Sequence, residues 1–316
     1  MEEEKSYQEI RKELIEKYKT VIEPKLLYYN NDFEKACKTR KFLKIMSFAY
    51  IFLPLILGFL FALLIPKNYS FLIRPAFTIF AITFMLFIGA KRQKIKQIKR
   101  HIKEIIMPII CDCFDNLKWV PDKVHSTEQY NQACLIPYSK SYRFVYDDCF
   151  RGMYKNIIFT VEELALKGNK NATIFKGVAL QFIINKKFNG HTVIYPNSIS
   201  HTSPSLKLHH TELEDVIFEK QYDVYTNDDV EARYLITPSF MKRLNEIQEK
   251  FYAHEIYAAF KNGVFYLALG SNKDLFEITD FEKQKIDMSQ YYIFVGEIIS
   301  ILKLIDYFKL DQNIGM

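Results

Sequence analysis

Two long apolar stretches, separated by five residues, constrain what this chain can fold into more than any other feature of its sequence. The first covers residues 45–65 and contains no charged residue, and the second covers residues 71–90 with Arg74 as its single charge. At about 1.5 Å per helical residue, a stretch of this length spans roughly 31 Å, which matches the hydrocarbon core of a bilayer. We therefore predict a transmembrane hairpin of two helices, with spans 45–65 and 71–90.

Two alternatives to the hairpin are less consistent with the sequence. A pair of buried core helices in a soluble protein would rarely combine these lengths in tandem with basic residues on both sides. A cleaved signal peptide is disfavoured because 44 residues precede the first stretch and no small-residue cleavage site follows it.

The positive charge of the chain is concentrated around these stretches. The net charge of the whole chain is +6. Residues 35–103 contain 14 basic residues and no acidic residue, whereas residues 104–316 have a negative net charge. An acidic remainder repels phosphate backbones, so we expect no nucleic-acid partner. Because basic flanks stay in the cytoplasm, we predict a multi-pass protein of the cell inner (cytoplasmic) membrane, with both termini cytoplasmic.

An amphipathic helix is expected on each side of the hairpin. Residues 4–22 place apolar side chains at three- and four-residue spacings, and this helix should stop near Pro24, with a second helical segment beginning at about Asp32. After the second span, isoleucines between 95 and 110 form a stripe opposite a basic face. The two arms either pack on each other or dock onto anionic lipid, and both can hold at once. The predicted membrane-surface contacts are Lys91, Arg92, Lys94, Lys96, Lys99 and Arg100.

From Trp119 onward the pattern favours an α+β domain with mainly antiparallel strands. Asn262-Gly263 is the strongest hairpin signal, and Phe188-Asn189-Gly190 also indicates a hairpin turn. Helices are predicted at Pro238–Phe251, with Thr237 as its cap, and at Tyr291–Phe308. The expected strands are Phe144–Phe150, Asn156–Leu166, Thr173–Asn185, His191–Tyr195, Glu255–Lys261 and Val264–Leu269.

The predicted organisation therefore has four parts. They are a cytosolic amphipathic arm (1–44), the transmembrane hairpin (45–90), a basic amphipathic helix (91–118) and a cytosolic α+β domain (119–316). Five cysteines without repeated spacing favour a reducing compartment over a disulfide scaffold.

The segment Phe218–Leu244 has a distinctive order of motifs: a Phe-Glu pair, a Val-Tyr before an acidic turn, Glu-Ala-Arg-Tyr, and Thr-Pro at the start of a helix. This run resembles the bacterial domain-of-unknown-function family 3137. Shorter similarities lie at residues 174–177, 188–193 and 274–277. The resemblance implies a two-span membrane protein with a cytosolic domain, and it implies no biochemical activity.

The same segment contains the candidate ligand-binding residues Asp228, Asp229, Glu231 and Arg233. In one interpretation they are structural: Asp228 caps a helix, Asp229 and Glu231 favour its positive end, and Arg233 pairs with a carboxylate such as Glu219. In the other they converge on a cationic or phosphorylated ligand.

No catalytic residue, metal site or cofactor is predicted. No phosphate-binding glycine motif is present, and Cys111 and Cys113 lie two apart on an expected helix, where they point in different directions. His209-His210, near Glu212 and Glu214, is interpreted as a solvated polar patch, with a transition-metal site as the alternative.

The sequence favours a non-enzymatic, membrane-anchored interaction or scaffold protein, because two spans with almost no polar residues offer no ion path. A membrane-tethered sensor of a small anionic ligand is the alternative, and an enzyme acting on a membrane-associated substrate is less favoured. The lipid bilayer is the expected partner, and the protein partner and homo-oligomeric assembly stay open.

Overall fold

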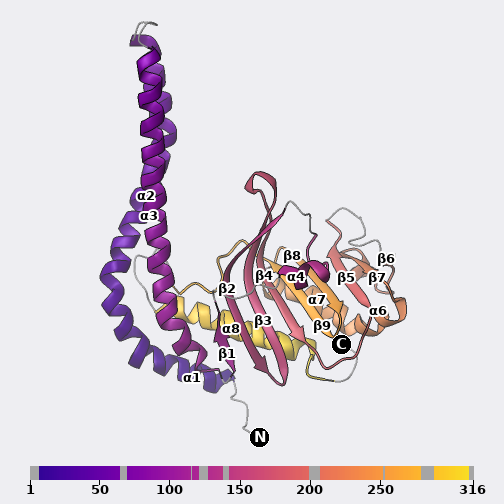
Figure 1. Cartoon of the computed structure of the whole chain (residues 1–316). Coiled ribbons are helices and arrows are strands. Elements are labelled where there is room, and N and C mark those ends of the chain that lie inside the picture. Colours follow the sequence, from indigo (N-terminus) through magenta and orange to yellow (C-terminus); the bar gives the residue numbers. More distant parts are fainter. Residues whose placement is uncertain are drawn as a thin grey trace. The chain divides into compact units, whose positions relative to one another are not determined.

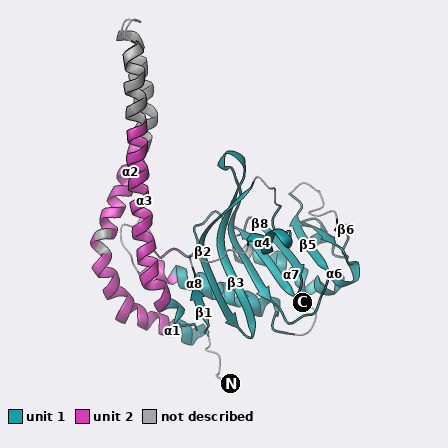
Figure 2. Ribbon diagram, viewed as in Figure 1, with its two compact units in different colours: residues 1–11, 110–276, 293–316 teal, residues 12–109, 277–292 magenta. Residues whose placement is uncertain are grey.

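The computed structural model describes residues 7–64, 70–114, 116–120, 127–137, 142–198, 207–251, 253–278 and 288–312, and it describes no side chains for residues 30, 32, 47–81, 249 and 250. The chain divides into two compact units (Figure 2). Unit 1 comprises residues 1–11, 110–276 and 293–316, and unit 2 comprises residues 12–109 and 277–292.

Unit 1 is built on a nine-stranded sheet in which every strand pairing is antiparallel (Figure 1). The strand order is β1-β2-β3-β4-β9-β8-β5-β7-β6. The α+β class with a mainly antiparallel sheet is therefore confirmed. The strands are β1 (Leu117–Trp119), β2 (Arg143–Tyr154), β3 (Ile157–Lys167), β4 (Thr173–Ile183), β5 (His191–Pro196), β6 (His209–Thr211), β7 (Tyr222–Thr226), β8 (Glu255–Lys261) and β9 (Val264–Gly270).

Two long helices cover one face of this sheet: α7 (Pro238–Lys250) and the part of α8 (Met288–Phe308) that belongs to unit 1. The ring of Phe240 on α7 lies 5.5 Å from that of Phe260 on β8 and 5.2 Å from that of Phe308 on α8, between ring centres. All three residues are fully buried. Because adjacent strand residues face opposite ways, the next residue along each central strand must be covered by another layer.

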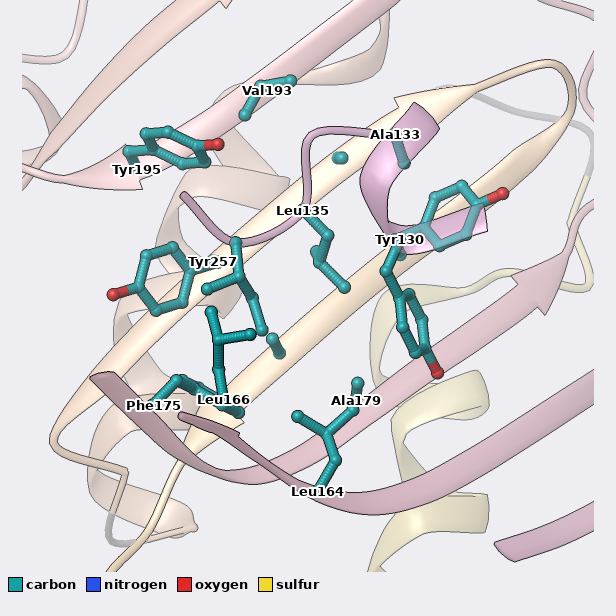
Figure 3. Close-up of a cluster of buried hydrophobic side chains, with 14 of the residues drawn as sticks. Tyr130, Ala133, Leu135, Leu164, Leu166, Phe175, Ala179, Val193, Tyr195 and Tyr257 are labelled. Carbon is teal, nitrogen blue, oxygen red and sulfur yellow. The ribbon is translucent and has the colours of Figure 1, made fainter. Parts of the chain in front are cut away.

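The other face carries that second layer, which consists of α4 (Thr127–Gln132) and the residues that follow it (Figure 3). Tyr130 and Leu135 from this segment belong to one buried cluster with Tyr257 and Leu166 of the sheet, and the ring centres of Tyr130 and Tyr266 lie 6.3 Å apart. The segment is also anchored by hydrogen bonds, since the Tyr195 hydroxyl donates to the Cys134 carbonyl at 2.5 Å. Coverage on both faces explains why β8 and β9 are buried along nearly their whole length.

Three short helices complete unit 1. They are the 3₁₀ turn η3 (Asn169–Asn171), α5 (Val216–Glu219) and α6 (Asp229–Leu235). The start of α1 (Tyr7–Lys17) also belongs to this unit, and the Tyr7 hydroxyl donates to Asp306 of α8 at 2.6 Å.

Unit 2 is helical. A π-helical turn, η1 (Tyr18–Ile22), joins α1 to the 42-residue helix α2 (Glu23–Leu64), and the equally long α3 (Ser70–Cys111) follows. Helices α2 and α3 pack on each other: the ring centres of Tyr29 on α2 and His101 on α3 lie 5.4 Å apart, and Ile102 and Ile106 of α3 are buried. The start of α8 adds to this core, where the Tyr291 hydroxyl donates to the Leu14 carbonyl at 3.0 Å.

The predicted helix break near Pro24 is wrong, and so is the new start near Asp32. Pro24 is the second residue of α2, which directly follows the π-helical turn, and the helical path continues through it. The π-helical turn before it contains one extra residue per turn, which rotates the buried face. As a result Ile22 is fully buried, whereas Val21, part of the predicted apolar stripe, is 36% exposed.

The predicted spans lie within α2 and α3, but residues 47–81 lie outside the described side chains and residues 65–69 outside the described backbone. Among the parts of the chain that are described, no helix has both the length and the apolar composition required to cross a bilayer.

Two further expectations are corrected. The basic helix ends at Cys111 rather than 118, because residues 117–119 pair with β2 as an edge strand. The turn at Phe188-Asn189-Gly190 does not join paired strands: β4 pairs with β3 and β9, and β5 pairs with β7 and β8. The Asn262-Gly263 hairpin between β8 and β9 is confirmed, and Gly263 has the positive φ of +75° that this turn requires.

Candidate functional site

The four predicted ligand residues all lie at the start of α6 or within it. Asp228 is the N-cap: its carboxylate accepts the backbone N–H of Glu231 at 3.0 Å. Side chains that accept a first-turn amide in this way stabilise a helix by about 1 kcal/mol. The structural interpretation of Asp228 is therefore confirmed.

Asp229 is bound to strand β6. Its carboxylate lies 3.1 Å from Nε2 of His209. A hydrogen bond from Thr211, together with this histidine, holds the pKa of Asp229 below its usual value. His210 lies beside a different carboxylate, that of Asp223 at 3.5 Å, so the two histidines do not share one metal-binding position.

Glu231 fastens the segment between β4 and β5. Its two carboxylate oxygens accept the backbone N–H groups of Asn189, at 3.0 Å, and Gly190, at 2.6 Å. A side chain at position 190 would collide with this carboxylate, because an added Cβ would lie 2.3 Å from its Oε1. The Asn189-Gly190 turn therefore binds the carboxylate of Glu231 through two backbone N–H groups, and it does not form a hairpin between paired strands.

Arg233 does not pair with Glu219. Its guanidinium donates to the backbone carbonyls of Asp229, at 3.3 Å, and Glu212, at 3.4 Å, and the side chain is exposed. Glu219 instead accepts the backbone N–H of Leu213 at 2.6 Å. The structure therefore brings the four residues onto one short helix but directs each acidic side chain to a separate protein segment.

Arg233 borders an open pocket of about 540 Å³. The remaining wall is largely apolar, and Val216 and Ile217 on its edge are 67% and 66% exposed. Arg233 is the one cationic residue of the lining, which also contains the acidic residues Glu214 and Asp215. The pocket is lined by Leu213, Glu214, Asp215, Val216, Ile217, Arg233, Ile236, Pro238 and Met241.

The predicted membrane-surface residues divide into two groups along α3. Arg92, Lys94 and Lys96 are exposed, and the ammonium of Lys91 lies 5.5 Å from the ring centre of Phe87. Lys99, by contrast, forms an ion pair with the buried carboxylate of Glu277 within unit 2. Arg100 pairs with Glu104 one helical turn away.

Two groups of charged residues were missed by the sequence analysis. Nζ of Lys186 and Nη1 of Arg243 are buried without a hydrogen-bond partner among the described residues. Burial, and secondarily the charge of Arg243, lowers the pKa of Lys186 to about 8. The carboxylates of Asp147, Glu163 and Asp274 form the second group. No local pattern marks either group, because their members come from separate elements.

The five cysteines are free thiols. Cys111 and Cys113 are both buried, and no disulfide joins any of the five cysteines, all of which lie in described parts of the chain. Burial raises the pKa of Cys111 to about 12 and likewise that of Cys149, so neither thiol is a ready thiolate nucleophile.

Residues 173–310 match a family described as Protein of unknown function (DUF3137). The resemblance stated from the sequence is therefore confirmed, and the matched range runs from β4 through α8 and contains all four quoted motifs. No curated protein matches the chain.

A solved structure is also similar in part. The crystal structure of the mycobacterial trehalose monomycolate transport factor A, TtfA, is matched with a TM-score of 0.30 and 6% sequence identity. The match covers 51% of this chain and 73% of that chain.

Proposed function

We propose that the chain is a non-enzymatic, membrane-anchored interaction protein, held by the helical hairpin 45–65 and 71–90, with the sheet unit on the cytoplasmic side. The observation that carries this proposal is a group of large apolar side chains on α3 that face solvent. Ile82, Met85, Leu86 and Phe87 are 59%, 73%, 67% and 46% exposed.

Ile82, Met85 and Leu86 recur at the spacing of one helix face, Phe87 lies beside them, and all four belong to the described end of the second predicted span. Exposing an apolar helix face of this kind to water is unfavourable. Each Å² of apolar surface that is removed from water stabilises the protein by about 25 cal/mol. The face is followed within two turns by Lys91, Arg92 and Lys94, and this order of apolar and basic residues is typical of a helix leaving a bilayer.

The chemistry of unit 1 supports an interaction role over catalysis. The carboxylates of Asp228, Asp229 and Glu231 each bind a protein group, as described above. What unit 1 offers instead is the apolar pocket beside Arg233 with Val216 and Ile217 exposed at its edge. Such exposed apolar groups around a cationic residue favour a protein partner.

The test uses a matched pair of arginine substitutions in the full chain. Ile82→Arg with Met85→Arg places two charges on the exposed face of α3, and Val230→Arg places one on α6, where Val230 is 80% exposed. In a bilayer each charge near the centre of a span costs about 2.5–3.5 kcal/mol, so the second span of the double variant should fail to insert and the residues after it should lie outside the cytoplasm, whereas Val230→Arg should keep the wild-type topology.

The proposal would be abandoned if the wild-type chain were extracted from membranes by carbonate, or if a C-terminal reporter lay on the same side of the membrane in the double variant as in the wild type. A reporter fused after Met316 tests the orientation independently, and activity restricted to the outside of the cytoplasm would contradict the assigned side.

A second candidate function, the sensing of a small anion, is favoured by Lys186 and Arg243. Two buried cationic atoms without a partner among the described residues, close enough for one charge to lower the pKa of the other, form a site that an anion would stabilise. This pair replaces the cluster around Arg233 as the centre of the sensor hypothesis.

Thermal unfolding with inorganic phosphate and nucleotides tests this second function. Lys186→Met and Arg243→Met should each remove a stabilisation that wild type and Arg233→Met both show. An equal response in all four proteins would place the anion elsewhere, and no response in wild type would reject the sensor.

A further inference from the structure

Three carboxylates from distant parts of the sequence meet at one position in unit 1. Asp147 lies on β2, Glu163 on β3 and Asp274 in the loop after β9. One oxygen of each carboxylate lies within 4.8 Å of an oxygen of both others. Like charges repel at this distance, so other interactions of the fold must hold the three carboxylates together.

A β-bulge brings two of the three residues together. In the pairing of β2 with β3, Tyr146 lies opposite Leu164 and Cys149 opposite Glu162. Asp147 and Asp148 of β2 therefore lie opposite the single residue Glu163, an irregularity that redirects side chains and is common beside functional sites. Asp148 is buried and accepts the indole N–H of Trp119 at 3.0 Å, which leaves Asp147 as the member of the pair in the cluster.

The loop that carries Asp274 is fixed to the sheet on both sides of this residue. The backbone N–H of Ser271 donates to the carbonyl of Lys176 at 2.8 Å. The backbone N–H of Leu275 donates to Oε1 of Glu163 at 3.0 Å. The position of Asp274 next to Glu163 is thus built into the fold.

Glu163 is the unusual member of the cluster. It is 3% exposed, and its Oε2 atom is buried without a hydrogen-bond partner among the described residues. A buried carboxylate oxygen in this state costs considerable free energy, particularly beside other carboxylates.

We propose that Asp147, Glu163 and Asp274 bind a hard divalent cation of the size of Ca²⁺. Oxygens on a common Ca²⁺ lie about 2.3–2.6 Å from the ion, so two of them are separated by at most about 5 Å, which the cluster already satisfies. Asp147 and Asp274 are exposed, so water can complete the coordination sphere.

Among the ion pairs of the described residues, the ammonium of Lys176 lies 3.8 Å from Oδ1 of Asp274. Both side chains of that pair are well exposed, at 37% and 53%, so the pair is weak and does not reach the buried oxygen of Glu163. A bound cation would neutralise all three carboxylates at once, which Lys176 cannot do.

The experiment is a titration of the purified full-length chain with CaCl₂, followed by calorimetry and by thermal unfolding. Glu163→Gln keeps the shape and the Oε1 acceptor for Leu275 but removes the charge. Asp147→Asn alters an exposed ligand without disturbing the core, and Asp112→Asn, an exposed carboxylate outside the cluster, is the matched control.

Wild type and Asp112→Asn should bind one Ca²⁺ and gain about 5 °C in Tm at 100 times the Kd. Glu163→Gln should lose the response, and Asp147→Asn should weaken binding at least tenfold. The site is refuted if millimolar Ca²⁺ gives no heat and no shift in wild type, or if both cluster variants bind as the wild type does. A response to Mg²⁺ without one to Ca²⁺ would equally contradict the proposed ion.

Discussion

Unit 1 and unit 2 place their large apolar side chains in opposite ways. In unit 1 the rings of Phe240, Phe260 and Phe265 are fully buried between the sheet and two helices. In unit 2 the described part of α3 leaves Met85 73% exposed and Leu86 67% exposed. The sheet unit therefore closes its own core, whereas the helical unit keeps an apolar face that its own residues do not cover.

This difference shows where each unit obtains its stability. Apolar burial within unit 1 comes from layers on both faces of one sheet, which requires no second molecule. The exposed face of α3 gains stability only where a non-aqueous environment or another chain covers it. In the proposed function the bilayer would cover this face of unit 2, as the sheet and helices cover the aromatic core of unit 1.

The largest expected effect separates the two units directly. Phe265 contacts the rings of Phe260 and Phe308 at 4.8 and 5.3 Å, so Phe265→Ala should lower the free energy of unfolding by about 4 kcal/mol through lost contacts and a cavity. Phe87→Ala on α3 should change it by less than about 0.5 kcal/mol, since Phe87 is 46% exposed.

Urea unfolding of the full chain in detergent measures both values, with the unchanged slope as the control for two-state behaviour. Equal effects of the two substitutions would mean that Phe87 is packed as tightly as Phe265, and the contrast between the units would be lost.

The local features of the fold could be predicted from the sequence, because their causes are local. Asn262-Gly263 lies between two alternating runs and forms the β8–β9 hairpin, and Thr237 caps α7, where its hydroxyl accepts the N–H of Phe240 at 3.2 Å. The order of the strands could not be predicted. Asn189-Gly190 has similar composition, yet its backbone N–H groups donate to the carboxylate of Glu231, a residue about 40 positions away.

The candidate sites illustrate the same limit. The capping role of Asp228 depends on three neighbouring residues, and the sequence contained all the information for it. The burial of Lys186 beside Arg243, and the meeting of Glu163 with Asp274, depend on strand pairing and loop anchoring far along the chain. Composition and spacing carry no trace of such contacts.

The next prediction concerns two buried lysines, one in each unit, whose replacement by methionine should change the stability of the chain in opposite directions. Lys103 in unit 2 is 4% exposed and donates to the carboxylate of Glu277 at 2.8 Å. Lys103→Met should destabilise the chain by about 2 kcal/mol, because among the described residues the buried carboxylate then retains the ion pair with Lys99 alone. Lys186 in unit 1 is 6% exposed without a partner among the described residues, so Lys186→Met should stabilise it by about 2 kcal/mol.

The pH dependence of unfolding checks the cause of the Lys186 effect. Below pH 8 the lysine is protonated in both the folded and the unfolded chain, and the folded chain bears the full cost of the buried charge. Between the folded pKa of about 8 and the unfolded value of 10.5, the folded chain loses the proton first, so wild-type stability gains from rising pH. The advantage of Lys186→Met should therefore shrink from pH 8 to pH 10.5. An advantage that stays constant over this range would assign the gain to packing instead.

The smallest expected effect compares two polar side chains that bind the backbone of a helix. Asp228 accepts an amide that would otherwise lack a helical partner, so Asp228→Ala should cost about 1 kcal/mol, and Asp228→Asn should retain most of the cap. Thr39 in α2 donates at 2.7 Å to the carbonyl of Lys35, which already accepts a helical bond, and alanine is the better helix former. Thr39→Ala should therefore leave the stability unchanged or raise it by a few tenths of a kcal/mol. Thermal unfolding of the three variants decides the matter, because a loss of 1 kcal/mol in Thr39→Ala would show that side-chain hydrogen bonds stabilise the long helices of unit 2 as they do the short helix of unit 1.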